Sequence, residues 1–280
     1  MQTGVVPFHA DKLRVISGEN FSLKQHDAAE TFDISKQKAE KELKDHVKQL
    51  AELHELLYAE NKRALLIVLQ GMDASGKDGT IRHVMSGVNP QGCTVTSFKQ
   101  PSTKELEHDF LWRIHAAVPE KGSIGIFNRS QYEDVLVVRV HELVAKEVWQ
   151  SRFDQINAFE RILVENDVTI LKFFLHISRE EQEKRFQKRV EDPQKNWKIS
   201  PADFREREYW GEYQKAYQDA IAKCSTKEAP WYIIPSDHKW FRNYCVSHII
   251  VRTLESFQMR YPKANPDVAG VKTGGKQTTR

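Results

Sequence analysis

Residues 71–78 read Gly-Met-Asp-Ala-Ser-Gly-Lys-Asp and have the G-x-x-x-x-G-K spacing of a phosphate-binding loop. Gly71 and Gly76 allow backbone conformations that a side chain blocks. The N–H groups of the turn and of the following helix can then point at an anion, and Lys77 adds a positive charge. The pattern predicts a phosphate- or nucleotide-binding site that also includes Met72, Ala74, Ser75, Asp78 and Gly79.

This loop departs from the common pattern at the residue that follows the lysine. A standard loop has Ser or Thr there, and its hydroxyl binds Mg²⁺. The present chain has Asp78, with a second carboxylate, Asp73, inside the loop. We therefore expect a carboxylate to hold the metal, with Asp73 the first choice and Asp134 the second. Mg²⁺ is the predicted cofactor, and Mn²⁺ is the alternative.

A second polar group, residues 128–134 (Asn-Arg-Ser-Gln-Tyr-Glu-Asp), follows the apolar run 123–127. Asn128 stands where a Walker B site has a metal-binding Asp, and Glu133 and Asp134 can supply carboxylates nearby. Arg129 can bind phosphate oxygens through two N–H groups. The alternative interpretation is a polar loop with a structural ion pair.

A basic series runs from Lys184 to Arg207. Arg185 and Arg189 are four residues apart and share a helix face, and Lys195 and Lys198 continue the series. Acidic residues are interspersed, so a solvated charged helix is the competing interpretation. Combined with a phosphate loop, the segment at about 179–210 is predicted to form a lid of the kind that excludes water from phosphoryl transfer.

Strands and helices alternate along the chain, and they must position these polar groups. Apolar runs predict five strands, and helical periodicity or polar turns separate them; the strands are at 64–70, 93–98, 123–127, 168–177 and 231–235. This order predicts an α/β fold with a mainly parallel, three-layered sheet. Ligands of such sheets lie at the carboxyl ends of the strands, where residues 71–78 and 128–134 both fall.

Capping residues locate several helices. Ser35 is a plausible N-cap for a helix to about Arg63. Ser102 with Glu105, and Ser178 with Glu181, have the spacing of capping boxes. The first box predicts a helix whose core face includes Leu106, Phe110, Ile114 and Ala117. Asp237 is expected to open a final helix to about Phe257.

Length and composition limit the possible partners, the cellular compartment and the number of domains. The 280 residues carry 42 basic and 39 acidic side chains, a formal charge of +3, which is too even to imply a nucleic-acid partner. Three cysteines without C-x-x-C spacing fit a reducing cytoplasm, and no apolar run is long enough for a membrane span. We expect one domain over 1–260, with an N-terminal arm over 1–34 and a disordered tail over 261–280.

The chain carries an ordered series of motifs at 71–79, 89–92 (Asn-Pro-Gln-Gly), 98–102 (Phe-Lys-Gln-Pro-Ser), 127–134, 192–198 and 229–232. Each motif alone is modest, but their order is highly specific. In this series the chain resembles the family-two polyphosphate kinases over roughly residues 40–250. The resemblance implies a thymidylate-kinase-like P-loop fold and Mg²⁺-dependent phosphoryl transfer between inorganic polyphosphate and a nucleotide.

Three positions differ from many family members, which carry Asp at the position of Asn128 and Asn-Arg at the positions of Glu133 and Asp134. The Tyr132-Glu133-Asp134 version resembles the subgroup that phosphorylates both nucleoside mono- and diphosphates. We therefore expect reversible transfer of the terminal phosphoryl of polyphosphate to AMP and ADP. The rival functions are an ATP-dependent nucleoside monophosphate kinase and a non-catalytic polyphosphate- or nucleotide-binding regulator.

The expected roles follow from charge. Lys77 and the loop hold the phosphates, and Arg129 and Arg189 stabilise the transferring group. Glu133 helps to select the acceptor. A polyanion needs a series of cations, and the expected polyphosphate contacts are Arg82, Arg185, Lys195 and Lys198. A homo-oligomer, dimer or tetramer, is the expected assembly.

Overall fold

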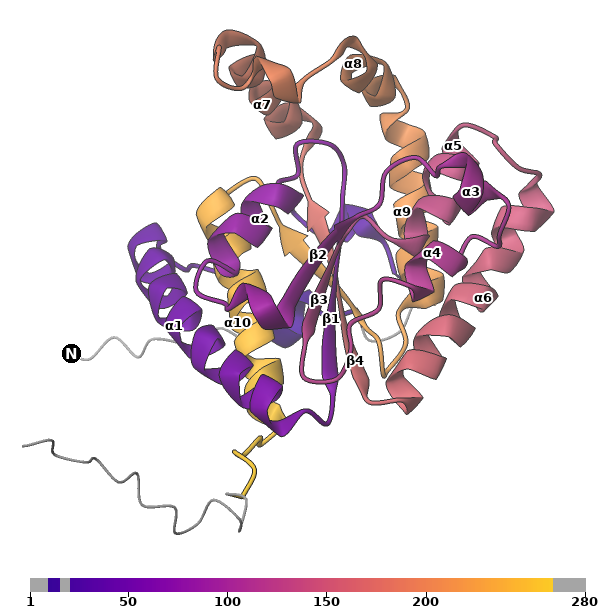
Figure 1. Cartoon of the computed structure of the whole chain (residues 1–280). Coiled ribbons are helices and arrows are strands. Elements are labelled where there is room, and N and C mark those ends of the chain that lie inside the picture. The colour runs from indigo at the N-terminus through magenta and orange to yellow at the C-terminus, as the bar shows by residue number, and fades with distance from the viewer. Residues whose placement is uncertain (1–9, 16–20, 264–280) are drawn as a thin grey trace, which may run out of the picture.

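A five-stranded, entirely parallel sheet forms the centre of the computed structural model, which describes residues 10–15 and 21–263 (Figure 1). The strand order is β2-β3-β1-β4-β5, so the strand before the phosphate loop is central. The predicted α/β fold with five strands is confirmed. The strands are β1 (Ala64–Gln70), β2 (Cys93–Ser97), β3 (Ile124–Asn128), β4 (Val168–His176) and β5 (Trp231–Pro235).

Helices cover both faces of this sheet, with α1, α2 and α10 on one side and α6 and α9 on the other (Figure 1). None of the helices in the described part of the chain is both long and apolar enough to cross a bilayer. The helices are α1 (Lys36–Glu60), α2 (Lys77–Val84), α3 (Thr103–Leu106), α4 (Trp112–His115), α5 (Val137–Val140), α6 (Lys146–Glu165), α7 (Arg179–Glu191), α8 (Pro201–Glu208), α9 (Trp210–Cys224) and α10 (Lys239–Ser256).

Strand β1 is buried along its whole length because successive side chains point to opposite faces. Leu65, Ile67 and Leu69 pack in the core shared with α1 and α10. Leu66 and Val68 pack in the core shared with α6 and α9. The apolar run before the phosphate loop is therefore fixed from both sides, which gives the loop a rigid start.

The helix predicted from Ser102 is wrong beyond its first turn. The capping box between Ser102 and Glu105 is present, but α3 ends at Leu106, whose side chain is 70% exposed rather than in the core. The side chain of Asp109 accepts a hydrogen bond from the backbone N–H of Leu111. Such an Asx turn competes with helix continuation, and helical structure resumes only in α4, where Ile114 is fully buried.

The second predicted capping box is only half formed. Ser178 Oγ accepts from the backbone N–H of Glu181, but the reciprocal bond is missing because the N–H of Ser178 donates to Asp237. The carboxylate of Glu181 instead pairs with Arg185 at 2.8 Å. Asp237 therefore ties α7 to the end of β5, and α10 begins after His238.

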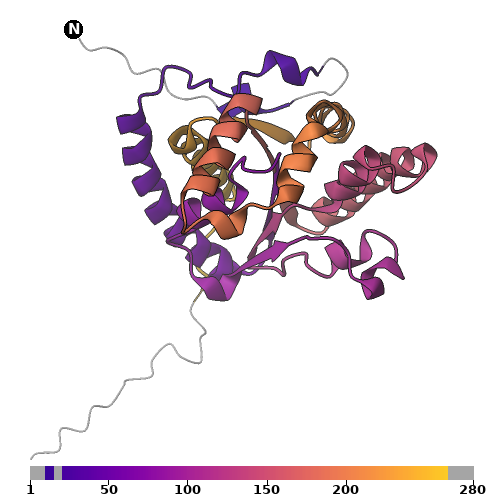
Figure 2. The same cartoon turned by 90° about the horizontal axis from the view of Figure 1, so that it is seen from above.

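The predicted lid lies over the carboxyl ends of the strands. Seen from above, α7 and α8 stand over the end of the sheet (Figure 2). Near the N-terminus, Val15 donates a backbone hydrogen bond to Trp231, and Leu13 and Leu23 are buried, so this part of the chain packs beside β5. The predicted tail lies outside the described residues from 264 onward.

Candidate active site

A cavity of about 730 Å³ opens at the carboxyl ends of the strands, between the phosphate loop, the lid and α10. Of the described residues that line it, eleven are Lys or Arg and three are Asp. Two of the three carboxylates, Asp73 and Asp78, belong to the phosphate loop. Such an excess of positive charge predicts an anionic ligand with several charges.

The backbone of the phosphate loop requires its two glycines. Gly71 has φ +150° and Gly76 has φ +106°, both in the region that disfavours side chains. A Cβ at Gly71 would lie 2.7 Å from the carbonyl oxygen of Leu175. One at Gly76 would lie 1.9 Å from Nη1 of Arg242. The Leu175 carbonyl oxygen and the Arg242 side chain therefore leave no room for a side chain at these two positions, so the loop needs glycine at both.

Lys77 is buried at the start of α2, with 9% of its surface exposed. Its Nζ donates to the carbonyl oxygens of Gly71 at 2.7 Å and Met72 at 3.3 Å. Burial, followed by the nearby charge of Arg129, lowers the pKa of Lys77 to about 8. The ammonium thus lies folded back on its own loop and can exchange neutral carbonyl partners for phosphate oxygens.

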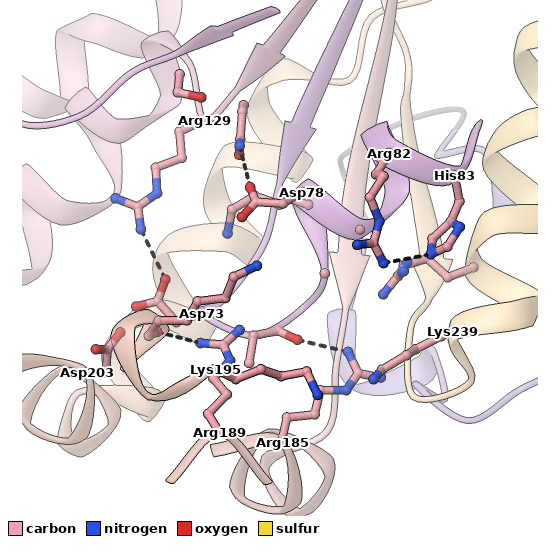
Figure 3. Close-up of a pocket in the computed structure, with 18 of the residues that line it drawn as sticks. Asp73, Asp78, Arg82, His83, Arg129, Arg185, Arg189, Lys195, Asp203 and Lys239 are labelled. Carbon is pink, nitrogen blue, oxygen red and sulfur yellow. Dashed lines mark hydrogen bonds and ion pairs between the residues drawn. The ribbon is translucent and has the colours of Figure 1, made fainter. Parts of the chain in front are cut away.

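Arg129 and Asp73 form an ion pair on one side of the cavity, with Nη2 to Oδ1 at 3.0 Å. Arg129 directly follows β3 and has φ +64°, a backbone conformation that non-glycine residues adopt at a cost. Its N–H donates to the carbonyl oxygen of Leu69, which holds the turn against β1. The turn thereby aims the guanidinium at the phosphate loop, as Figure 3 shows.

The amide of Asn128 donates from Nδ2 to Oδ1 of Asp78 at 2.7 Å. The two positions that hold metal in a standard P-loop enzyme therefore contact each other, with the carboxylate on the loop and the amide on the strand. Among the described residues, no group of three or more His, Cys, Asp or Glu converges into a metal cage. Mg²⁺ is usually bound by one or two carboxylates together with substrate phosphates. Asp73 and Asp78, which both line the cavity, fit that donor set.

Asp134, the second predicted metal ligand, lies in a different environment. Its carboxylate is paired with Arg152 at 3.0 Å, and it is not among the cavity-lining residues. Burial raises the pKa of Asp134 to about 6 against the opposing effect of Arg152. Asp134 is thus held by Arg152 away from the cavity, whereas Asp78 lines it.

Glu133 is not among the cavity-lining residues, but it interacts electrostatically with Arg129 and Lys77, which do line the cavity. Its side chain is half-buried, and burial raises its pKa while Arg129 and Lys77 act in the opposite direction.

Arg185 has a different task from the one predicted. Its Nε donates to Glu181, Nη1 donates to the carbonyls of Ala74 and Ser75, and Nη2 donates to those of Ser236 and Asp237. These bonds use all five N–H donors of an arginine. Arg185 fastens the phosphate loop to α7 and to the end of β5 and has no donor left for polyphosphate.

The other predicted cations line the cavity, as Arg185 does, but keep donors available: Arg82 on α2, Arg189 on α7, and Lys195 and Lys198 beyond it. Arg189 donates to the carbonyl of Lys198 at 3.2 Å, and Lys195 pairs with Asp192. These contacts are exposed, so a polyanion can compete for the side chains.

Four cavity-lining cations were missed by the sequence reasoning: Lys99, Lys188, Lys239 and Arg242. Lys239 and Arg242 both lie on α10. They are three residues apart and follow β5. The rule that ligands bind at strand ends could have found them, had it been applied to every strand.

A buried charged network was also missed. Lys172 on β4 donates to Glu160 at 2.5 Å and to the hydroxyl of Tyr132 at 2.9 Å. Glu160 also accepts from Gln131. The network thereby fixes the turn between Arg129 and Glu133.

The model for the family described as Polyphosphate kinase 2 (PPK2) matches residues 33–262. The chain belongs to the polyphosphate kinase 2 family. Its match to this family includes the phosphate loop, the turn at 128–134, the lid and α10.

Similar PPK2 proteins cover nearly the whole chain. An AMP/ADP-polyphosphate phosphotransferase from Meiothermus ruber is 51% identical over 263 residues, 93% of this chain and 98% of the relative. An ADP-polyphosphate phosphotransferase from Rhodopseudomonas palustris is 46% identical over 268 residues, 91% and 93% of the two chains. A crystal structure of polyphosphate kinase 2 from Arthrobacter aurescens TC1 matches with a TM-score of 0.90 at 42% identity and covers 93% of both chains. The parallel P-loop fold is therefore that of the PPK2 family.

Proposed function

We propose that this PPK2 protein transfers the terminal phosphoryl group of inorganic polyphosphate to AMP and to ADP, reversibly. The observation that carries the proposal is the cavity in which Lys77 and the phosphate loop face a surplus of Lys and Arg side chains. The names of the relatives from Meiothermus ruber and Rhodopseudomonas palustris supply the substrates.

The reaction needs positioning more than acid–base chemistry. An oxygen of the acceptor's terminal phosphate, already ionised at neutral pH, forms a bond to the terminal phosphorus of polyphosphate. The bond from that phosphorus to the bridging oxygen breaks, and polyphosphate leaves one phosphoryl shorter. Charge spreads over the transferring group in such reactions. Lys77, Arg129 and Arg189 supply positive charge around it.

Mg²⁺ is the proposed cofactor, with Mn²⁺ as the alternative, and Asp73 and Asp78 are the proposed carboxylate ligands. When bound, the ion neutralises phosphate charge. Asp73 and Asp78 would hold the ion, and Arg129, which now pairs with Asp73, would then be available to the transferring group. Polyphosphate contacts are proposed for Arg82, Lys195 and Lys198.

A product assay tests the function. The purified protein is incubated with Mg²⁺, polyphosphate and each of AMP, ADP, GMP and GDP, and the nucleotides formed are separated. We expect ADP and ATP from the adenine acceptors. Transfer from ATP to a nucleoside monophosphate, with none from polyphosphate, would instead identify the ATP-dependent kinase. Binding without any turnover would identify the regulator.

Lys77→Ala is the control that ties turnover to this cavity. Losing one preorganised contact to developing charge costs on the order of 10²–10³ in rate. Near-normal turnover in the folded variant would place the active site elsewhere.

We further propose a cytoplasmic location and a homo-oligomer, dimer or tetramer. The three cysteines are free thiols, which suits a reducing compartment. β2 is an outer strand of the sheet, and Val95 on it is 50% exposed, which suits self-association. Sedimentation of the purified protein tests the assembly.

A further inference from the structure

Five consecutive carbonyl oxygens of the phosphate loop, those of residues 71–75, accept hydrogen bonds from side chains. The first two bind Lys77 of the loop itself, and the other three bind side chains of α7 and α10. The carbonyl oxygen of Asp73 accepts from Nε2 of Gln182 at 3.0 Å. Gln182 lies near the start of α7 and is 1% exposed. The lid helix therefore holds the loop through Gln182 as well as through Arg185.

The bond to Asp73 fixes a strained peptide unit. The orientation of the peptide between Asp73 and Ala74 depends on the φ angle of Ala74, which is +61°. Residues other than glycine adopt such values at a cost, so an external contact is needed to hold this orientation. In a trans peptide the C=O and N–H groups point in opposite directions. With the carbonyl bound to Gln182, the N–H of Ala74 is turned away from α7. Ala74 lines the cavity and Gln182 does not, so this orientation presents the N–H to a bound phosphate.

The amide of Gln182 contributes little else at this position. Its Oε1 is buried and has no hydrogen-bond partner among the described residues. Burying an unpaired polar atom is costly, and an apolar side chain of similar size would avoid that cost. What the amide adds is therefore the N–H donor to the carbonyl oxygen of Asp73.

Arg185 continues the same row of donors. It lies three residues after Gln182, on the same face of α7, and its Nη1 donates to the carbonyl oxygens of Ala74 and Ser75. Building on the function proposed above, we propose that Gln182 is a positioning residue for phosphoryl transfer. It holds the peptide between Asp73 and Ala74 so that the N–H of Ala74 faces the transferring phosphate.

The kinetics of Gln182→Met test this role, because methionine has a similar length and no N–H donor. The kcat and the KM values are measured with polyphosphate and each of AMP and ADP. Loop N–H groups act where negative charge accumulates during the transfer. We therefore expect kcat to fall on the order of 10-fold with both acceptors, the factor that one hydrogen bond supplies, with little change in the KM of any substrate.

Gln187→Met is the matched control. It makes the same change on the same helix, at an exposed side chain whose amide binds Glu191. Its kcat and KM values should equal those of the wild type. Hydrogen exchange of the backbone amides of residues 70–80 gives a readout that does not depend on turnover. Exchange in this segment should be faster in Gln182→Met than in the control.

Ala74→Gly supplies a rescue that depends on the orientation of the peptide. Glycine adopts a positive φ without the cost of a Cβ, so a loop with glycine at this position needs the bond from Gln182 less. We expect the double variant Gln182→Met/Ala74→Gly to recover part of the kcat that Gln182→Met loses. A loss caused by altered packing around Gln182 would not respond to a change at Ala74.

A wild-type kcat in folded Gln182→Met, or no recovery in the double variant, would overturn the assignment and leave Gln182 as a packing residue. Gln182→Leu also lacks a donor, and it replaces the methionine variant in both measurements if that variant does not fold. Absence of polyphosphate turnover in the wild-type protein would instead contradict the proposed function. Hydrogen exchange would then still report whether Gln182 holds the loop, so the two failures are distinguishable.

Discussion

Asn128 and Asp78 are joined by a hydrogen bond of 2.7 Å from the amide Nδ2 to the carboxylate Oδ1. Asn128 is the last residue of β3 and Asp78 is the second residue of α2. An amide at the strand end can donate to the loop carboxylate and orient it, whereas a carboxylate at that position cannot donate when ionised. Asp78 and Asn128 therefore form one hydrogen-bonded unit, in which the amide orients the carboxylate.

Asn128→Asp should make the protein's stability depend on Mg²⁺. Two carboxylates then face each other at a partly exposed site, where like charges cost about 1 kcal/mol or a little more. In a chain of this size we expect a loss of about 2–4 °C in Tm without metal, regained when Mg²⁺ is added. Asn128→Ala removes the same hydrogen bond without adding charge, so its Tm should respond to Mg²⁺ as the wild type does. Identical Mg²⁺ responses in the two variants would argue against Asp78 as part of the metal site.

The pH dependence of turnover should report the charge of Lys77. Its lowered pKa of about 8 means that the ammonium is protonated below pH 8 and becomes neutral above it. The neutral amine cannot attract phosphate, so kcat/KM, which reflects the free enzyme, should fall as the pH rises through about 8. With substrate bound, phosphate raises this pKa, and the fall in kcat should occur at higher pH.

Lys77→Arg is the matched variant for this profile, because a guanidinium stays charged over the whole range. Its turnover is expected to be lower, since the planar group does not fit a site shaped for a compact ammonium, but its kcat/KM should not fall near pH 8. A fall at the same pH in both proteins would assign the ionisation to another group.

The exposed cations of the lid should contribute to the binding of polyphosphate more than to the binding of the nucleotide. Lys195→Ala and Lys198→Ala each remove an exposed charge that lines the cavity, and Arg189→Ala removes a half-buried one. Since exposed charge pairs contribute up to about 1 kcal/mol, each change should weaken polyphosphate binding by roughly fivefold or less, with Arg189→Ala also lowering kcat. Lys36→Ala on α1, where the side chain is 65% exposed, is the control. Unchanged affinity and rate in all three variants would rule out the lid contacts.

Arg185→Ala should behave differently from these three. Because Arg185 holds the carbonyls of Ala74 and Ser75, its loss should lower Tm and impair both substrates together. Selective loss of polyphosphate binding at unchanged Tm would instead restore the sequence-based prediction that Arg185 contacts the donor.

Glu133 should help to determine which acceptor is used. A monophosphate is one phosphoryl unit shorter than a diphosphate, so its reacting oxygen falls short if the nucleoside binds in the same place. The charge of Glu133, close to Arg129 and Lys77, can position Mg²⁺ in the space that the extra group of ADP would fill. Glu133→Asn should therefore lower kcat/KM for AMP much more than for ADP. Glu133→Gln removes the charge at equal length, and an equal loss on both acceptors in both variants would indicate a structural or general catalytic role.

Local sequence patterns correctly predicted the segments whose conformation depends on residues adjacent in the chain. The phosphate loop and the bounds of β1 and β5 match the structure, because glycine conformations and apolar runs are properties of short segments. The ordered motifs also identified the PPK2 family. Local patterns failed after Leu106, where one Asx turn outweighed a helical apolar stripe.

The sequence by itself determined that Lys77 belongs to the phosphate loop, because the lysine and the loop are adjacent in the chain. Only the tertiary structure decided which of the other charged residues are available to a ligand. Asp134 meets Arg152, the donors of Arg185 all bind protein, and Arg242 reaches Ser75 across 167 positions of sequence. A charged side chain acts through the partners within hydrogen-bond distance, and its residue type and spacing do not specify those partners when they come from distant parts of the chain.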